Sequence, residues 1–542
     1  MCKKRGLSTA IIASLCVLLT ACGSTGTTSV PSASPSSKDS SDGPLTKYAS
    51  PVSITAAMQD AGFTRPSGTD FNNNPWIKGY KSALNIDVKV TTVGSLSNDE
   101  YKTKINTAIA SDSLPDVFSV DATQYQQLAE AEKIIDINGV FNAYASDATK
   151  KKANQDNGAS QAAARLDGKL YAIVQPAGYG EMSSMIWVRT DWLEKCGLQA
   201  PKTIDDVWNI AKTFKGKKLG GASTVGLAFT NDIINNLTPF TALANCYGAY
   251  PHTWIDGGSG NLIYGSTTDA MKTFLSKFQE MYKAGVIDHE FGSNDKTKMY
   301  QTIAAGRAGI FFGDFCSPFD LVNSYKQDNK AAWQSYKIVT NDGSLAKTQV
   351  NTAFMGGWVI SSKCKNPEAV IKMLNFAVDK IDNDPETYNL NGLNNYAVLK
   401  LTSNNDNIRI SADYQKYLKD SAVKPTDEAE RSTFSQCDSW LKSKDLTSGY
   451  AMYNIFGPKG SIDVTASGFK NDGFLVSPFR GAKTETMVSK GGSLDTIEQT
   501  AIINIMIGTK DISSFDTFVS QWNANGGNQE TTEVNKWLSE HK

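Results

Sequence analysis

A strand–helix–strand pattern near the start of the chain constrains the fold more than any other feature of the sequence. After a first candidate strand at 52–56, apolar and polar residues alternate over residues 85–93, with the period of a half-buried strand. Residues 101–109 then place their apolar side chains on one face of a helix, and residues 114–120 (LPDVFSV) predict another strand. Because this order forms a βαβ unit, we predict an α/β protein with a parallel or mixed sheet.

Strands and amphipathic helices continue to alternate along the chain. Residues 184–188 predict a strand, and Thr203 begins a helix with an acid at the third helical position, which is a capping box. Apolar residues of 271–282 line one face of another helix, and Asn366 is expected to cap a helix that starts with Pro367. A chain of 542 residues is long enough for two or more lobes, each with its own core.

The amino terminus has the composition of a secretory signal. Basic residues at 3–5 precede an apolar stretch, 7–21, that is too short to favour a membrane-spanning helix. The stretch ends in Leu19-Thr20-Ala21-Cys22, which resembles the lipobox where a diacylglyceryl group is attached to the cysteine thiol. We therefore predict a lipoprotein signal peptide over 1–21 and a lipid anchor on Cys22, at the extracytoplasmic face of the cell membrane. The alternative is a plain signal peptide with an incidental cysteine.

The segment that follows is rich in Ser, Thr, Gly and Pro. Residues 22–46 contain too few apolar side chains to form a core, so we predict a flexible tether between the anchor and the folded part. The five cysteines beyond Cys22 are widely scattered and form neither a disulfide framework nor a CxxC site.

Charge and histidine content argue against several function classes. The net charge is −1, and loss of three basic residues and no acid with the signal takes it to −4, which gives no electrostatic case for nucleic-acid binding. The three histidines, His252, His289 and His541, have no metal-ligand spacing. We predict no metal and no cofactor.

Several ordered segments resemble the large lipoprotein branch of the family 1 extracellular solute-binding proteins, which are the sugar-binding components of ABC importers. The clearest stretch, 166–214, contains DGK at 167–169, YAI at 171–173 and RTDWL at 189–193. The other segments are 282–288 (YKAGVID), 306–309 (GRAG), 366–369 (NPEA), 507–509 (IGT) and 533–537 (EVNKW). Each is weak alone, but together with the lipobox they cover nearly all of the chain beyond the tether.

The resemblance implies a two-lobed periplasmic-binding-protein-like fold of class II, with discontinuous lobes joined by a hinge. The expected N-terminal lobe comprises 47–176 and about 351–440, and the C-terminal lobe comprises 177–350 and about 441–542. The expected crossings between lobes lie near 174–180, 351–358 and 435–450.

Relatives often carry an acidic calcium-like loop after the helix that ends near Phe214. Residues 215–221 (KGKKLGG) lack the oxygen ligands that calcium needs, so calcium is not predicted there.

The function implied by the resemblance is capture, without catalysis, of a carbohydrate such as an oligosaccharide. The monomeric lipoprotein would close around its ligand at the hinge and deliver it to the permease subunits of an ABC importer. Two alternatives stay open at this point. A lipid-anchored glycoside hydrolase would need two carboxylates roughly 5 to 10 Å apart, and a binding lipoprotein for peptides or other non-sugar solutes would have similar lobes.

A sugar site needs aromatic rings for the C–H faces and carboxylates or amides for the hydroxyls. Asp121 is a candidate because it directly follows a predicted strand, although it could instead cap the next helix. Tyr179 and Glu181 flank a glycine at the first expected crossing, and Asp314 with Phe315 resembles the family strand end that faces ligand.

The remaining candidates are aromatic. Trp76 lies in a polar loop, Trp254 precedes a turn, Trp358 follows two glycines near the second crossing, and Phe479 follows a proline. The competing interpretation is partial burial for Trp76, a structural role for Trp254 and packing for Trp358.

Overall fold

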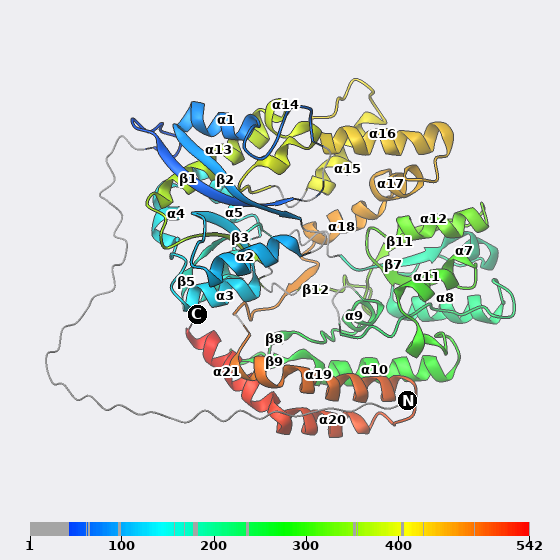
Figure 1. The fold of residues 1–542 in the computed structure, drawn as a ribbon. Helices are drawn as coiled ribbons and strands as arrows, with labels where there is room; N and C mark the ends of the chain where they lie inside the picture. Colours follow the sequence, from blue (N-terminus) through cyan, green and yellow to red (C-terminus); the bar gives the residue numbers. More distant parts are fainter. Residues whose placement is uncertain are drawn as a thin grey trace, which may run out of the picture. The chain divides into compact units, whose positions relative to one another are not determined.

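The computed structural model describes most of the chain beyond the amino-terminal segment (Figure 1). The described residues are 43–540 except 61, 63–64, 96–98, 157, 167, 177–182, 235–237, 351–353, 355, 403–405, 427 and 482. The predicted signal peptide, the lipidated Cys22 and most of the tether therefore lie outside the described residues. The candidates Tyr179 and Glu181 lie outside them as well.

The first sheet has five strands in the order β2-β1-β3-β13-β6. The strands are β1 (Val52–Asp60), β2 (Ile86–Ser95), β3 (Val117–Asp121), β6 (Ala172–Ile173) and β13 (Gly356–Ile360). β1 pairs in parallel with β2 and β3, and β13 pairs antiparallel with β3 and β6. The sheet is mixed, and the predicted βαβ unit is confirmed as β2, α2 and β3.

Helices surround this sheet. They are α1 (Pro75–Gly79), α2 (Glu100–Ala110), α3 (Ala122–Glu130), α4 (Asn138–Tyr144), α5 (Asp147–Ala153), α6 (Ala159–Ala163), α13 (Pro367–Asn383) and α14 (Pro385–Tyr388). The short strands β4 (Arg165–Leu166) and β5 (Lys169–Leu170) form a separate hairpin, and helical turns η1 (Tyr80–Leu84) and η5 (Leu390–Tyr396) complete this part.

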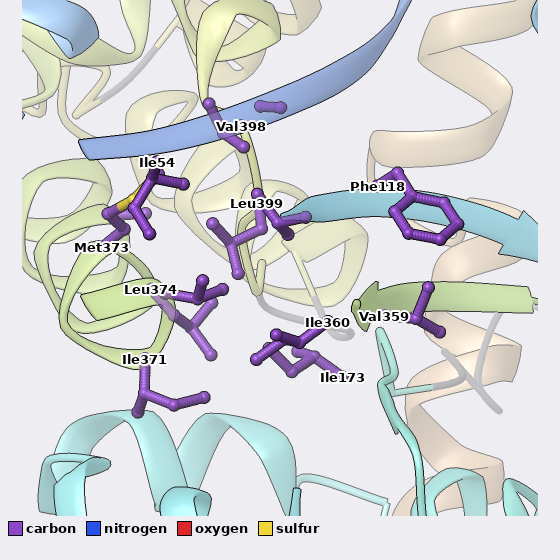
Figure 2. Packing of buried hydrophobic residues seen from close by; sticks show 14 of the residues in the cluster. Ile54, Phe118, Ile173, Val359, Ile360, Ile371, Met373, Leu374, Val398 and Leu399 are labelled. Atoms are coloured by element: carbon purple, nitrogen blue, oxygen red, sulfur yellow. The ribbon is translucent and has the colours of Figure 1, made fainter. Parts of the chain in front are cut away.

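One apolar core joins two stretches that are far apart in the sequence, 54–174 and 359–401. Figure 2 shows Ile54, Ile173, Ile360, Leu374 and Leu399 around the same apolar space. Burying a Leu or Ile side chain contributes about 1.5–3 kcal/mol, so these contacts tie α13 to the sheet.

A second, three-stranded sheet has the order β10-β7-β11, with both neighbours antiparallel to β7. The strands are β7 (Met185–Arg189), β10 (Ile310–Gly313) and β11 (Trp333–Lys337). The helices around it are α7 (Thr190–Cys196), α8 (Ile204–Gly216), α9 (Pro239–Asn245), α10 (Asp269–Lys283), α11 (Lys296–Ala304) and α12 (Pro318–Gln327). Three further helices, α19 (Glu485–Met506), α20 (Ser514–Trp522) and α21 (Asn528–Glu540), pack together, and α19 contacts α10. Its main core combines residues of 186–346 with residues of 494–534.

Short strand pairs and a group of four helices complete the described part. β8 (Trp254–Asp256) pairs antiparallel with β9 (Leu262–Tyr264), and β12 (Thr348–Val350) pairs in parallel with β14 (Phe474–Val476). Helices α15 (Asp406–Tyr417), α16 (Glu428–Ser443), α17 (Gly449–Phe456) and α18 (Ser461–Lys470) share a small core of their own. The predicted lobe limits stay a prediction.

The starts of α8 and α13 were both predicted from local sequence signals, and only the cap of α8 forms as expected. The Thr203 hydroxyl accepts a hydrogen bond from the Asp206 N–H at 3.1 Å, and the Asp206 carboxylate accepts one from the Thr203 N–H at 3.0 Å, so the predicted capping box is confirmed. Pro367 occupies the first position of α13 as expected, but the Asn366 side chain does not cap the helix. It donates to the Glu368 carboxylate at 3.3 Å instead.

Within the part of the chain that the structure describes, no helix is both long enough and apolar enough to cross a membrane.

Candidate functional site

Asp121 is the last residue of β3 and also the cap of α3. Its Oδ1 accepts a hydrogen bond from the Gln124 N–H at 2.8 Å, and the Gln124 side chain accepts one from the Asp121 N–H at 3.2 Å. Lys102 Nζ lies 2.7 Å from Asp121 Oδ2. Burial raises the pKa of Asp121, but the Gln124 hydrogen bond and the Lys102 charge outweigh burial and lower it. The carboxylate is therefore ionised near neutral pH, and the helix cap foreseen as its alternative role is present.

A small pocket surrounds Asp121, with a volume of about 240 Å³. We call it the β3 pocket, and it is lined by Gln59, Ser95, Asp99, Tyr101, Lys102, Ser119, Val120, Asp121 and Gln124. Gln59, Ser95 and Asp121 stand at or next to the carboxyl ends of three parallel strands, β1, β2 and β3. This is the edge of an α/β sheet at which ligands bind.

Asp314 directly follows β10 and lines a larger pocket of about 570 Å³. We call it the β10 pocket, and it is lined by Thr230, Asn231, Asp232, Thr238, Pro239, Asp295, Lys296, Met299, Tyr300, Phe312, Gly313, Asp314 and Gln499. Asp314 Oδ1 accepts a hydrogen bond from the Cys316 N–H at 2.9 Å, which fixes the turn after the strand. Asp295 Oδ1 caps α11 by accepting from the Lys298 N–H at 2.8 Å.

Two side chains of the β10 pocket have notable surroundings. Thr230 is only 3% exposed, and its hydroxyl has no hydrogen-bond partner among the described residues. Such a group costs about 1–3 kcal/mol when buried, which a guest in the pocket would offset. The Tyr300 hydroxyl donates to Ser317 Oγ at 3.1 Å, and Lys296 Nζ lies 5.8 Å from the centre of the Tyr300 ring.

Most of the predicted aromatic candidates pack against protein instead. Phe315 contacts two apolar clusters, one of them the core of α15–α18, and its carbonyl accepts from Ser461 Oγ at 2.7 Å. Trp254 is 6% exposed and lies against Tyr264, with ring centres 5.3 Å apart. Phe479 packs edge-on against Trp537 at 5.0 Å. None of these three lines either pocket.

The structure places Trp76 inside the first core rather than in a site. The side chain is 0% exposed, its ring contacts Tyr80, Phe376 and Tyr388, and its Nε1 donates to the Leu393 carbonyl at 2.8 Å. A ring that is covered on its faces offers no stacking surface, and its complete burial goes beyond the partial burial expected as the alternative.

Trp358 is half-buried on β13 and lies opposite Ser119 of β3. Directly paired residues point to the same face of a sheet, and Ser119 lines the β3 pocket. Among the aromatic candidates within the described residues, Trp358 is therefore the one that pairs with β3, two residues from Asp121.

A group of buried acids lies beside the β10 pocket, next to Gln499 on α19. Glu498 is fully buried, and Tyr264 donates to its Oε2 at 3.0 Å. His252 Nδ1 lies 3.3 Å from Glu498 Oε1, an atom that makes no hydrogen bond among the described residues. Burial raises the pKa of Glu498. Burial, together with the charges of Asp495, Glu533 and Glu498, raises the pKa of Glu530 to about 7.

These shifts predict that the protein is more stable at pH 5 than at pH 8. The pKa of Glu530 is about 7 in the folded protein, against about 4.5 in the unfolded protein. Protonation of Glu530 therefore contributes fully to the free energy of unfolding below pH 4.5, and this contribution is lost as the pH rises to about 7. We expect Glu530→Gln to raise the free energy of unfolding at pH 8 by about 1 kcal/mol, after allowance for solvent screening. Urea unfolding at pH 5, 6, 7 and 8 measures this, with Glu540→Gln at the exposed end of the same helix as control. An unchanged pH dependence in Glu530→Gln would contradict the assignment.

Polar pockets at strand ends, on a mixed α/β scaffold, define a ligand-binding protein of the α/β class. The sequence profile described as bacterial extracellular solute-binding protein matches residues 66–380, more than half of the chain. The chain belongs to this family.

Two curated relatives match over most of their length. Lipoprotein LipO of Bacillus subtilis is 22% identical over 483 residues, which cover 87% of this chain and 90% of that protein. The polygalacturonan/rhamnogalacturonan-binding protein YtcQ of Bacillus subtilis is 23% identical over 465 residues, which cover 84% and 86%.

Solved structures show the same fold. The alginate-binding protein AlgQ2 without calcium ion has a TM-score of 0.54 and 17% identity, covering 92% of this chain and 100% of that one. An HMO-binding, ABC-transporter-associated solute-binding protein from Bifidobacterium longum infantis has a TM-score of 0.57 and 13% identity, covering 91% and 99%. The predicted class, the α/β fold of the periplasmic solute-binding proteins, is confirmed.

The sequence pattern singles out Asp121 and Asp314, which line the two pockets, but not Thr230, Asp232 and Tyr300. Those three come from separate segments, and no local pattern marks them. Asp295 does carry a signal, because an acid directly before an amphipathic helix is a cap, but a cap position alone does not indicate a pocket.

Proposed function

We propose that the chain is the lipid-anchored, extracytoplasmic binding component of an ABC importer and that it captures a carbohydrate without altering it. Family membership supports solute binding. The relatives include proteins named for binding polygalacturonan/rhamnogalacturonan and for fructooligosaccharide transport. The observation that carries the proposal is the β10 pocket, in which hydrogen-bonding and aromatic side chains gather at the end of a strand.

The chemistry of the β10 pocket suits a polyhydroxylated guest. Asp232, Asp295 and Asp314 supply carboxylate acceptors, and Asn231 supplies an amide that both donates and accepts. Hydrogen bonds from hydroxyls to charged acceptors are roughly twice as strong as neutral ones. Tyr300 adds an aromatic surface for the C–H faces of a sugar ring.

The surface around the pocket has room for more than one sugar unit. A second hollow of about 560 Å³ shares Lys296 and Tyr300 with the β10 pocket and continues past them to Asp320 and Asn323 on α12. Two hollows that share a wall suit a chain of sugars better than a single ring, which supports an oligosaccharide ligand.

The anchor and the capture mechanism belong to the same proposal. The basic residues at 3–5, the apolar stretch 7–21 and Cys22 support attachment to the membrane through lipid. The β3 and β10 pockets stand on different sheets. A ligand that contacts both pockets only when the hinge is closed shifts the population toward the closed state, which the permease would then recognise.

The test is a thermal-shift panel of oligosaccharides and peptides on the protein without its signal peptide, followed by calorimetric titration. Bound ligand raises the midpoint by mass action, so a shift with oligosaccharides and none with peptides supports the proposal. A shift with peptides alone would assign a non-sugar solute. Turnover of chromogenic glycosides would instead make the protein a glycoside hydrolase.

For the oligosaccharide that the panel identifies, we expect Asp314→Asn to weaken binding about tenfold, because a charged acceptor becomes a neutral one. The amide oxygen can still accept from the Cys316 N–H, so the turn and the unfolding midpoint should be retained. Asp516→Asn, an exposed acid on α20, is the matched control and should bind as the unmodified protein does. Equal affinities for both variants would remove Asp314 from the site.

A further inference from the structure

The β10 pocket carries more negative than positive charge. Its described lining includes three carboxylates, those of Asp232, Asp295 and Asp314, and a single cationic side chain, that of Lys296. We propose that this pocket selects uncharged oligosaccharides and rejects those that carry carboxylate groups, such as oligomers of uronic acids. The inference rests on the proposed carbohydrate-binding function and specifies its ligand class.

The carboxylates are held as hydrogen-bond acceptors. Asp314 and Asp295 each use Oδ1 to accept a backbone N–H, from Cys316 and Lys298. The Oδ2 atoms of both have no protein partner among the described residues, which leaves them for a donor on the guest. A sugar hydroxyl can donate to such an oxygen, whereas an ionised uronate carboxylate has no proton to donate there and repels it.

Lys296 is poorly placed to neutralise this charge. Its ammonium lies 5.8 Å from the centre of the Tyr300 ring. Burial raises the pKa of Asp320, and the Lys296 charge only partly opposes that rise. The one cation of the described lining therefore lies near an aromatic ring and acts on an acid of the neighbouring hollow. Arginine, whose planar fork pairs with a carboxylate through two hydrogen bonds, is absent from the described lining.

Thr230 gives independent support for a hydroxyl-bearing guest. The side chain is 97% buried, lines the pocket and has no partner for its hydroxyl among the described residues. A hydroxyl both donates and accepts one hydrogen bond, so a neutral sugar hydroxyl satisfies it in either sense.

The β3 pocket also carries more negative than positive charge in its described lining. Its described lining contains the acids Asp99 and Asp121 and one cation, Lys102. Lys102 Nζ is 2.7 Å from Asp121 Oδ2, so its charge is already paired. Within its described lining, the β3 pocket therefore offers no unpaired cation to a uronate. This chain should differ in ligand class from relatives that are named for polygalacturonan and alginate, which are polymers of uronic acids.

The experiment titrates the protein without its signal peptide with two sets of oligosaccharides of equal length. The neutral set contains gluco-, galacto-, manno-, xylo- and fructo-oligosaccharides, and the acidic set contains galacturonate, mannuronate and guluronate oligomers. We expect binding from the neutral set with little dependence on NaCl between 20 and 500 mM. Uronates should bind at least about tenfold more weakly, because like charges meet in a partly desolvated pocket.

A charge reversal supplies the second measurement. Asp314→Lys should shift the ratio of uronate to neutral affinity toward uronates by at least about tenfold. Asp516→Lys changes the net charge equally at an exposed site on α20 and should leave the ratio unchanged. Uronates that bind the unmodified protein as tightly as neutral sugars would overturn the charge selection and leave the carbohydrate function intact. Binding by neither set would overturn the carbohydrate function and this inference with it.

Discussion

Replacing Arg189 with leucine is expected to lower the free energy of unfolding by about 3–5 kcal/mol, the cost of breaking a buried ion pair. Arg189 ends β7 and is only 2% exposed. Its Nε and Nη2 donate to the two carboxylate oxygens of Asp191 at 2.8 and 2.6 Å, and Nη2 also donates to Asp328 at 3.2 Å. The guanidinium lies 4.8 Å from the centre of the Trp192 ring. Removing it leaves the largely buried Asp191 carboxylate with only the exposed Lys195 as a nearby cation.

Urea unfolding followed by circular dichroism measures this loss. Lys195→Leu is the matched control, because Lys195 Nζ is 3.9 Å from the same carboxylate but is 60% exposed, and its loss should cost less than about 1 kcal/mol. A double variant, Arg189→Leu with Asp191→Leu, should recover about 1–3 kcal/mol of the single-variant loss, since no buried charge remains unpaired. Equal losses from Arg189→Leu and Lys195→Leu would refute the buried-pair explanation.

This pair gives the RTDWL segment a physical meaning that its sequence pattern does not reveal. Arg189 and Asp191 are two residues apart, a separation that by itself predicts no contact. The strand ends between them and α7 begins, and this turn brings the guanidinium fork onto the carboxylate. Periodicity predicted the strand, but the contact depends on the turn after it.

Regular elements were predictable because their signals are local. The alternation over 85–93, the helical face of 101–109 and the capping box at Thr203 each depend on neighbouring residues, and each is confirmed. Asp121 and Asp314 could be chosen as candidates on a similar basis, since a polar residue directly after a strand stands at the edge of a sheet.

The rest of the candidate site is formed by tertiary contacts between distant segments. Thr230, Asp295, Asp314 and Gln499 meet in one pocket although they span about half the chain. Neither the composition of the chain nor the spacing of these residues predicts that they line one pocket. The buried, unpartnered hydroxyl of Thr230 becomes informative only once its surroundings are known.

Trp76 shows how a polar loop can mislead. Three asparagines precede Pro75 and Trp76, and this polar loop suggested a stacking surface or a partly buried ring. In the structure all three side chains bond backbone atoms. The Asn72 side chain bonds the backbone of Val90 through both its nitrogen and its oxygen, at 3.1 and 2.8 Å. Asn74, which is 1% exposed, caps α1 by accepting from the Ile77 N–H. The polar residues of the loop therefore anchor it to the sheet and turn the ring inward.

Trp76→Ala is consequently expected to cost about 3–5 kcal/mol in the free energy of unfolding, the range for deleting a large aromatic side chain from a core. The ring fills space against Tyr80, Phe376 and Tyr388. Trp76→Phe keeps much of that packing and loses the hydrogen bond to the Leu393 carbonyl, so about 1–3 kcal/mol is expected. Chemical unfolding followed by circular dichroism orders the two variants.

Ligand binding separates packing from stacking at this position. If Trp76 acts only in the core, Trp76→Phe should bind the identified oligosaccharide within about twofold of the unmodified protein under conditions where both are folded, since a twofold change in affinity is well under 1 kcal/mol. Trp358→Ala, at the half-buried position opposite Ser119, is the comparison. If Trp76→Ala kept the unfolding midpoint but lost the ligand response, the ring would belong to the binding site. That result would contradict the buried position of Trp76 and the packing of the loop of Asn72 and Asn74 against the sheet.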